Sequence, residues 1–136
     1  DAVPSKFGAS DVQDLNWVQL LNAYTCTECG RCTSSCPANQ TGKKLSPRKI
    51  MMDTRDRLEE VGKNIDANKG VFVPDNKTLL NDYITPEELW ACTSCNACVE
   101  ECPVNISPFN YYGYETIFSN GTKCRTNAIE CNDDQY

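Results

Sequence analysis

Ten cysteines are present in this 136-residue chain, and eight of them form two runs with the same spacing. The runs are Cys26-x2-Cys29-x2-Cys32-x3-Cys36-Pro37 and Cys92-x2-Cys95-x2-Cys98-x3-Cys102-Pro103. Each cysteine of the second run lies 66 residues after its counterpart in the first, and Thr93 and Asn105 follow Thr27 and Asn39 at the same offset. Repetition at a fixed offset indicates an internal duplication of a ligand-bearing loop.

The spacing within each run suits an iron–sulfur cube. Three thiolates separated by two residues each can bind one side of a cube, with the intervening amides facing the sulfides. The fourth cysteine, followed by proline, ligates the other cluster in two-cluster ferredoxins. We therefore predict two 4Fe-4S clusters with crossed ligand sets: Cys26, Cys29, Cys32 and Cys102 for cluster 1, and Cys92, Cys95, Cys98 and Cys36 for cluster 2. Crossed ligation would connect the two halves of the chain through metal.

Two other uses of the cysteines explain the pattern less well. A zinc site takes two CxxC pairs around one ion, which leaves the third cysteine of each run without a reason for its spacing. A disulfide framework needs an oxidising compartment, and close CxxCxxC triplets are poor partners for one another. Both alternatives are therefore disfavoured.

Composition excludes several classes of function. No histidine is present, which removes histidine-based catalysis and Rieske-type clusters. The formal net charge is −6, so we expect no nucleic-acid partner. No stretch approaches the length of a membrane span, and no signal peptide is recognisable at Asp1. The hydrophobic content of 40% includes the cysteines, so the apolar core is thin and metal is expected to help hold the fold.

Helices are predicted around both cysteine runs. Residues 14–24 lead into the first run, with apolar positions near one stripe: Leu15, Val18, Leu21 and Ala23. Between the runs, Ser46-Pro47 predicts a helix start, Gly62 its end, and residues 64–76 a loop. A short helix over residues 79–84 and a capping box at Thr85–Glu88 lead into the second run. Trp17 and Trp90 are expected to pack in the interior.

This arrangement resembles the α-helical ferredoxin, the two-cluster module found in the iron–sulfur protein of succinate dehydrogenase and in the C subunit of heterodisulfide reductase. The resemblance covers about residues 12–110 and rests on the segments Cys26–Cys32, Cys36–Ala38, Thr41–Lys43, Leu45–Met52 and Leu89–Cys98. The heterodisulfide reductase-like family is the closer one, because the succinate dehydrogenase type mixes cluster kinds and carries an extra plant-type domain. The resemblance implies an all-α fold with two cluster-binding loops between short helices. Residues 1–12 are assigned to a linker, 13–110 to the ferredoxin domain and 111–136 to an irregular tail.

The tail departs from the repeat after Pro108. One choice of codons for Asn110–Phe118, read from the second base, encodes Ile-Ile-Met-Asp-Met-Arg-Arg-Tyr, which restores a helix similar to the one after the first run. We hypothesise that residues 111–136 are frameshifted, so that Cys124 and Cys131 ligate nothing. The alternative is a divergent tail whose two cysteines form a disulfide or a lone metal pair.

The resemblance implies electron transfer through two 4Fe-4S clusters within a larger heterodisulfide reductase-like oxidoreductase. The expected partner is a redox protein or an adjacent catalytic domain, because no catalytic motif is visible in this chain. Family members often follow a membrane-embedded region, so we expect a location in the cytoplasm or at the cytoplasmic face of the inner membrane. The alternative is a structural or interaction module that metal only staples. Five basic residues are candidate counter-charges that raise the cluster potential or dock a partner, although a solvated surface is the favoured role for most of them: Arg31, Lys43, Lys44, Arg48 and Lys49.

Overall fold

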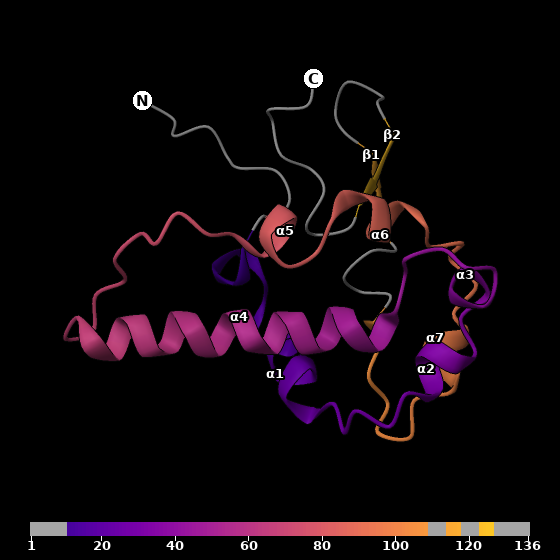
Figure 1. Ribbon diagram of the computed structural model, residues 1–136, viewed down its shortest axis with the longest axis horizontal. Helices are drawn as coiled ribbons and strands as arrows, with labels where there is room; N and C mark the ends of the chain where they lie inside the picture. Colours follow the sequence, from indigo (N-terminus) through magenta and orange to yellow (C-terminus); the bar gives the residue numbers. More distant parts are fainter. Residues whose placement is uncertain (1–10, 109–113, 118–122, 127–136) are drawn as a thin grey trace.

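One long helix, α4 (Pro47–Ala67), crosses the structure, with some short helices above and below it and the others grouped beyond its amino-terminal end (Figure 1). The computed structural model describes residues 11–108 and the backbone of residues 114–117 and 123–126. The shorter helices are η1 (Val12–Asp14), α1 (Trp17–Thr25), α2 (Arg31–Ser34), α3 (Pro37–Gln40), α5 (Leu79–Asp82), α6 (Pro86–Trp90) and α7 (Ala97–Glu100). The domain that carries the cysteine runs is thus all-α, as the sequence predicted. None of the described helices has the length and apolar character needed to span a membrane.

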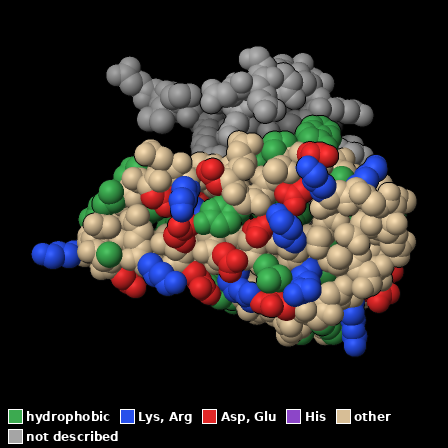
Figure 2. Space-filling view, in the orientation of Figure 1, with side chains coloured by type: hydrophobic (Ala, Val, Ile, Leu, Met, Phe, Trp, Pro, Cys, Tyr) green, Lys and Arg blue, Asp and Glu red, His purple; other side chains and the backbone are tan. Residues whose placement is uncertain are grey.

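Helix α4 begins where the sequence predicted. The Ser46 hydroxyl accepts a hydrogen bond from the backbone N–H of Lys49 at 3.3 Å, and Pro47 occupies the first turn. One face of the helix is buried at a spacing of three to four residues: Pro47, Ile50, Met51, Thr54, Arg57 and Val61. The exposed side carries acidic and basic side chains intermixed, as Figure 2 shows on the face in view. An amphipathic pattern therefore places α4 against the core by one face only.

The predicted end of this helix at Gly62 was wrong. The helix continues to Ala67, where Asn68 caps it by donating from its side chain to the Asn64 carbonyl at 2.8 Å. Ile65, beyond the glycine, packs against the core. A glycine inside a helix costs only about 0.5–1 kcal/mol relative to alanine, so one further buried side chain is enough to carry the helix past it.

Helix α1 is turned differently from the predicted stripe. Its buried residues are Gln19 and Ala23, which lie one turn apart in the helix that contacts α4. Val18 and Leu21 are on the exposed side, and Leu15 is buried before the helix starts. The expectation that Trp17 and Trp90 pack in the interior was also wrong, since they are 74% and 55% exposed.

The segment between α4 and the second cysteine run is less regular than predicted. Only Leu79–Asp82 of the expected helix over 79–84 is helical, and Asn81 within it has a φ of 77°. The turn nevertheless buries Leu79, Leu80 and Ile84. The Thr85 capping box formed as predicted: the Thr85 N–H donates to Glu88 at 2.8 Å, and the Glu88 N–H donates to the Thr85 hydroxyl at 3.3 Å.

Both boundaries of the domain carry features that the sequence did not suggest. Asp11 and Val12, assigned to the linker from the sequence, are buried. In the tail, β1 (Tyr114–Ile117) and β2 (Lys123–Thr126) pair as antiparallel strands, with Thr116 opposite Cys124. The remaining residues of the expected tail, and residues 1–10 of the expected linker, lie outside the described residues.

Candidate iron–sulfur centres

The first cysteine run forms a loop between α1 and α2 with an unusual backbone. Cys26 follows α1 directly, and Glu28 and Gly30 have positive φ angles of 60° and 79°. Gly30 is the N-cap residue of α2. Left-handed residues of this kind turn backbone N–H groups toward one side of a loop, which is the arrangement that anionic and iron–sulfur groups need.

The second run repeats this backbone. Ser94 and Asn96, each 66 residues after Glu28 and Gly30, have positive φ angles of 58° and 62°. Helix α7 then starts after Asn96 as α2 starts after Gly30. Non-glycine residues in this conformation cost of order 1–3 kcal/mol each and occur mostly at functional sites. The duplication seen in the sequence is therefore a duplication of the ligand loop in three dimensions.

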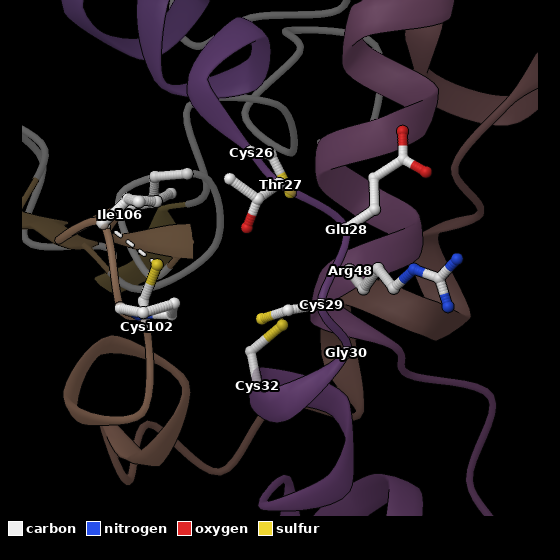
Figure 3. Close-up of a pocket in the computed structure, with 11 residues that line it drawn as sticks. Cys26, Thr27, Glu28, Cys29, Gly30, Cys32, Arg48, Cys102 and Ile106 are labelled. Atoms are coloured by element: carbon white, nitrogen blue, oxygen red, sulfur yellow. Dashed lines mark hydrogen bonds between the residues drawn. The ribbon is translucent and has the colours of Figure 1, made fainter.

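The structure brings the eight cysteines together as two groups of four. One pocket of about 290 Å³ is lined by Cys26, Cys29, Cys32 and Cys102, and Figure 3 shows Cys102 facing the three thiols of the first run. A second pocket of about 290 Å³ is lined by Cys36, Cys92, Cys95 and Cys98. In each pocket three cysteines come from one run and one from the other. Helices α2 and α7, which contact each other, hold the two runs side by side (Figure 1).

The donor set of each pocket fits a 4Fe-4S cluster. Such a cluster takes four cysteine thiolates, and each pocket offers four cysteines and no other metal-ligand type except Glu28 in the first. Within residues 11–108, no three Cys, Asp or Glu side chains converge closely enough to hold a single metal ion. The thiols instead line a space between them, which suits a cluster of several atoms better than a single ion.

Burial differs among the thiols of both pockets. Cys29 and Cys95, at matching positions, are exposed, whereas Cys36 and Cys98 are only 7% and 8% exposed. Backbone amides already contact two sulfurs: Ser94 donates to Cys92 at 3.4 Å and Ile106 donates to Cys102 at 3.3 Å. Burial also raises the pKa of the Cys32 thiol. Each pocket thus has one exposed cysteine, and the two buried cysteines both line the second pocket.

Hydrogen bonds fix the first loop onto α4. The hydroxyls of Thr33 and Ser46 are 2.9 Å apart, and the Arg48 N–H donates to the Thr33 hydroxyl at 3.3 Å. Glu28 pairs with Arg55 of α4, and this hydrogen bond holds the pKa of the Glu28 carboxyl below its usual value. The loop that carries three thiols is therefore attached to the start and the middle of the long helix.

The second loop is attached to α4 through Lys49. Its ammonium lies 2.7 Å from Asp53 on the same helix and 2.9 Å from Glu88 on α6. The same ammonium donates to the Tyr83 carbonyl at 3.2 Å. Hydrogen bonds to these two carboxylates raise the pKa of Lys49 against the opposing effect of burial. Because α6 leads into Cys92, this ion pair positions the second run.

Some residues of the first pocket were not found from the sequence. Val104 and Ile106, just after the second run, line the pocket of the first. One signal in the sequence points to this segment: Asn105 lies 66 residues after Asn39, the same offset as that between the two cysteine runs. Among the five basic residues expected as counter-charges, Arg48 alone lines one of the two cysteine pockets.

The fold and the two crossed cysteine pockets define a helical two-cluster ferredoxin. Comparison with known families agrees, because the family model described as "4Fe-4S dicluster domain" matches residues 25–106. The chain belongs to this family and holds two 4Fe-4S clusters. No solved structure matches it.

Three relatives show the kinds of protein in which this sequence recurs. The chain is 35% identical over 133 residues, covering 76% of it, to the probable iron-sulfur-binding oxidoreductase FadF of Bacillus subtilis. It is 33% identical over 118 residues to EtfAB:quinone oxidoreductase of Syntrophomonas wolfei, covering 74% of this chain. It is 37% identical over 87 residues to a subunit of the ferredoxin/F(420)H(2)-dependent CoB-CoM heterodisulfide reductase of Methanosarcina acetivorans, covering 63% of this chain and 39% of that one. The chain spans only 19% and 16% of the first two relatives.

Proposed function

We propose that this chain carries single electrons between its two clusters as a domain or subunit of a larger oxidoreductase. When bound, each cluster supplies a reversible one-electron couple. The crossed lining of the pockets, in which Cys36 and Cys102 each line the pocket of the other run, is the observation that carries the proposal, because it brings two cluster sites next to each other. The eight cysteines named above are the proposed ligands.

An exposed apolar face supports a protein partner beside the first cluster. Helix α1 carries no charged residue, and four of its side chains are at least 42% exposed: Trp17, Val18, Leu21 and Tyr24. Their spacing of three and four residues places them on one side of the helix. The same helix leads directly into Cys26. This face therefore suits a redox protein or an adjacent catalytic domain docked within reach of the first pocket.

The proposal includes a place in the cell. A 34% identical relative from Chromohalobacter salexigens is named a probable membrane-anchored ferredoxin. This name supports attachment to a membrane-embedded region, and we place that attachment at the cytoplasmic face of the inner membrane, with the described residues outside the bilayer.

Metal and sulfide content with EPR tests the redox function. Anaerobically prepared protein is expected to contain about eight irons and eight sulfides, and to give coupled signals after dithionite reduction that disappear on reoxidation. Zinc without sulfide, or clusters that do not cycle, would instead identify a metal-stapled structural module.

Cross-linking tests the partner face. A photoreactive amino acid at Leu21, in the exposed face of α1, is expected to cross-link to a redox protein or to an adjacent domain in the native host. Val71 is 64% exposed on the loop after α4 and is the matched control position. Equal cross-linking from both positions would contradict a specific docking face.

A further inference from the structure

We propose that Arg48 raises the reduction potential of the cluster held by Cys26, Cys29, Cys32 and Cys102 above that of the second cluster. Electrons would then pass from the second pocket to the first. This inference rests on the electron-transfer function proposed above. It assigns a direction to that transfer and a residue that sets it.

Arg48 is placed at the wall of the first pocket by contacts on both sides. Its backbone N–H binds Thr33 at 3.3 Å, and its Cδ would lie 4.0 Å from a Cβ built on Gly30. Figure 3 shows the side chain beside Cys29, with the end of the guanidinium directed away from the four sulfurs. Arg48 therefore acts as a fixed neighbouring charge, and it is not a ligand.

The surroundings of Arg48 affect how strongly its positive charge acts on the first pocket. Its Nε is buried and has no hydrogen-bond partner among the described residues, although buried N–H groups are nearly always paired. On the side away from the cysteines, Arg48 also lines an open pocket with Asp53 and Asp56, and Asp53 is paired there with Lys49. Arg48 as a whole is half-buried, and a half-buried charge interacts more strongly with a nearby negative centre than a fully exposed charge does.

The acidic residue of the same pocket does not cancel Arg48. Glu28 lines the wall, but its carboxylate is paired with Arg55 of α4. Since Arg55 neutralises Glu28, Arg48 is the remaining charged side chain in the lining of the first pocket. Adding an electron to a cluster adds negative charge, so a positive neighbour favours reduction.

The second pocket has no comparable group. Besides its four cysteines it is lined by Leu45, Pro47, Thr93 and Asn96, none of which is charged. The two loops share one backbone conformation, so the loops themselves do not supply the difference in charge that Arg48 introduces between the two pockets. An electron arriving from a one-electron donor at the second pocket reduces that cluster. Its transfer to the first reoxidises the second, and no proton need move.

Electron transfer toward the first pocket would deliver electrons close to the exposed apolar face of α1. The first pocket opens at Cys29, and α1 with its apolar face ends at Cys26. Electrons held preferentially in the first pocket are therefore available to a partner docked on α1.

An EPR-monitored redox titration of the cluster-loaded chain tests the inference. The wild-type protein is expected to show two one-electron steps, with the first-pocket cluster reduced at the higher potential. Arg48→Gln should lower the midpoint potential of that step by about 59 mV, which is a tenfold change in the equilibrium constant of a one-electron reduction. The midpoint potential of the other step should not change. Arg48→Lys keeps the charge and should restore part of the shift. Cys95→Ser, which alters only the second pocket, identifies the two signals.

The matched control is Arg31→Gln, an exposed arginine next to Gly30 that lines neither pocket. Equal shifts for Arg31→Gln and Arg48→Gln, equal shifts of both steps, or a higher potential in the second pocket would each overturn the inference while leaving the electron-transfer function intact. If neither cluster is reduced in wild-type protein, the proposed function itself fails.

Discussion

The guanidinium of Arg57 binds the carboxylate of Asp11 through two hydrogen bonds of 3.0 and 2.8 Å. Arg57 is fully buried in the middle of α4, and it also contacts Asp75 at 2.6 Å and the Lys77 carbonyl at 2.8 Å. This arginine therefore joins the start of the domain, the long helix and the loop after it. The hydrogen bond from Arg57 lowers the pKa of Asp75 to about 2.

Replacing Arg57 should destabilise the domain strongly. Arg57→Met leaves Asp11 and Asp75 without their cation, and loss of one partner of a buried pair costs about 3–5 kcal/mol. Urea unfolding followed by circular dichroism measures the change. Arg55→Met is the control, because Arg55 is partly exposed and pairs only with Glu28 among the described residues, so its loss should cost less than about 1 kcal/mol. Equal effects of the two substitutions would contradict a structural role specific to Arg57.

Crossed ligation predicts which pairs of cysteine substitutions act on the same cluster. Cys102→Ala combined with Cys26→Ala damages one pocket only and should leave about four irons per chain. Cys102→Ala combined with Cys98→Ala damages both pockets and should leave almost none. Iron and sulfide analysis distinguishes the two double variants. The opposite result would show that each run ligates a cluster by itself.

The tail is predicted to be dispensable for metal binding. If residues 111–136 are frameshifted, replacing both Cys124 and Cys131 by serine should leave iron and sulfide content unchanged. Sequencing the gene across codon 110, together with peptide mass analysis of the protein, tests the frameshift directly. An intact reading frame with a matching peptide mass would refute it.

Gly62→Ala should stabilise the protein by about 0.5–1 kcal/mol. Gly62 lies inside α4, and a Cβ built there meets no atom within 4 Å. Alanine therefore lowers the conformational entropy of the unfolded chain without a clash. Gly70→Ala is the contrasting variant, because Gly70 has a φ of 89° and alanine is strained there. Thermal midpoints of the two variants should move in opposite directions.

Alkaline pH should weaken the contact between Tyr83 and Glu60. Their hydrogen bond raises the pKa of the Tyr83 phenol from 10.0 to about 12. The folded protein thus holds this proton more tightly than the unfolded chain does, so the stabilisation is present below about pH 10 and is lost as pH rises to about 12. Urea midpoints measured across this range should fall more for wild-type protein than for Tyr83→Phe. Tyr24→Phe, which changes an exposed tyrosine on α1, should retain the wild-type slope.

The sequence predicted best where residue type and spacing have one chemical explanation. Cysteine spacing predicted which four thiols the structure brings to each pocket, although their role as ligands stays a prediction. Capping residues predicted where α4 and α6 begin, because Ser46 and Thr85 satisfy local backbone groups. The capping pattern depends on neighbours within a few residues, whereas the grouping of the cysteines follows from a motif that occurs twice in the chain.

Contacts between distant segments that share no such repeated motif could not be predicted. Gly62 predicted a helix end, yet packing of Ile65 carries α4 further. Arg57 was not singled out, since its partners lie 46 and 18 residues away in sequence. The tryptophans were expected inside, but Trp17 lies on the exposed side of α1. Each of these outcomes depends on how separate parts of the chain pack together, which local sequence patterns do not reveal.

The loop after α4 separates the chain into two segments that each contribute cysteines to both pockets. Lys69 and Gly70 are exposed in this loop, and cleavage there would break the chain between the two runs. Cys36 of the amino-terminal fragment would still line the second pocket. Cys102 of the carboxy-terminal fragment would still line the first. A protease-nicked domain should therefore migrate as one particle while its iron is present, and should separate into two fragments when a chelator removes it.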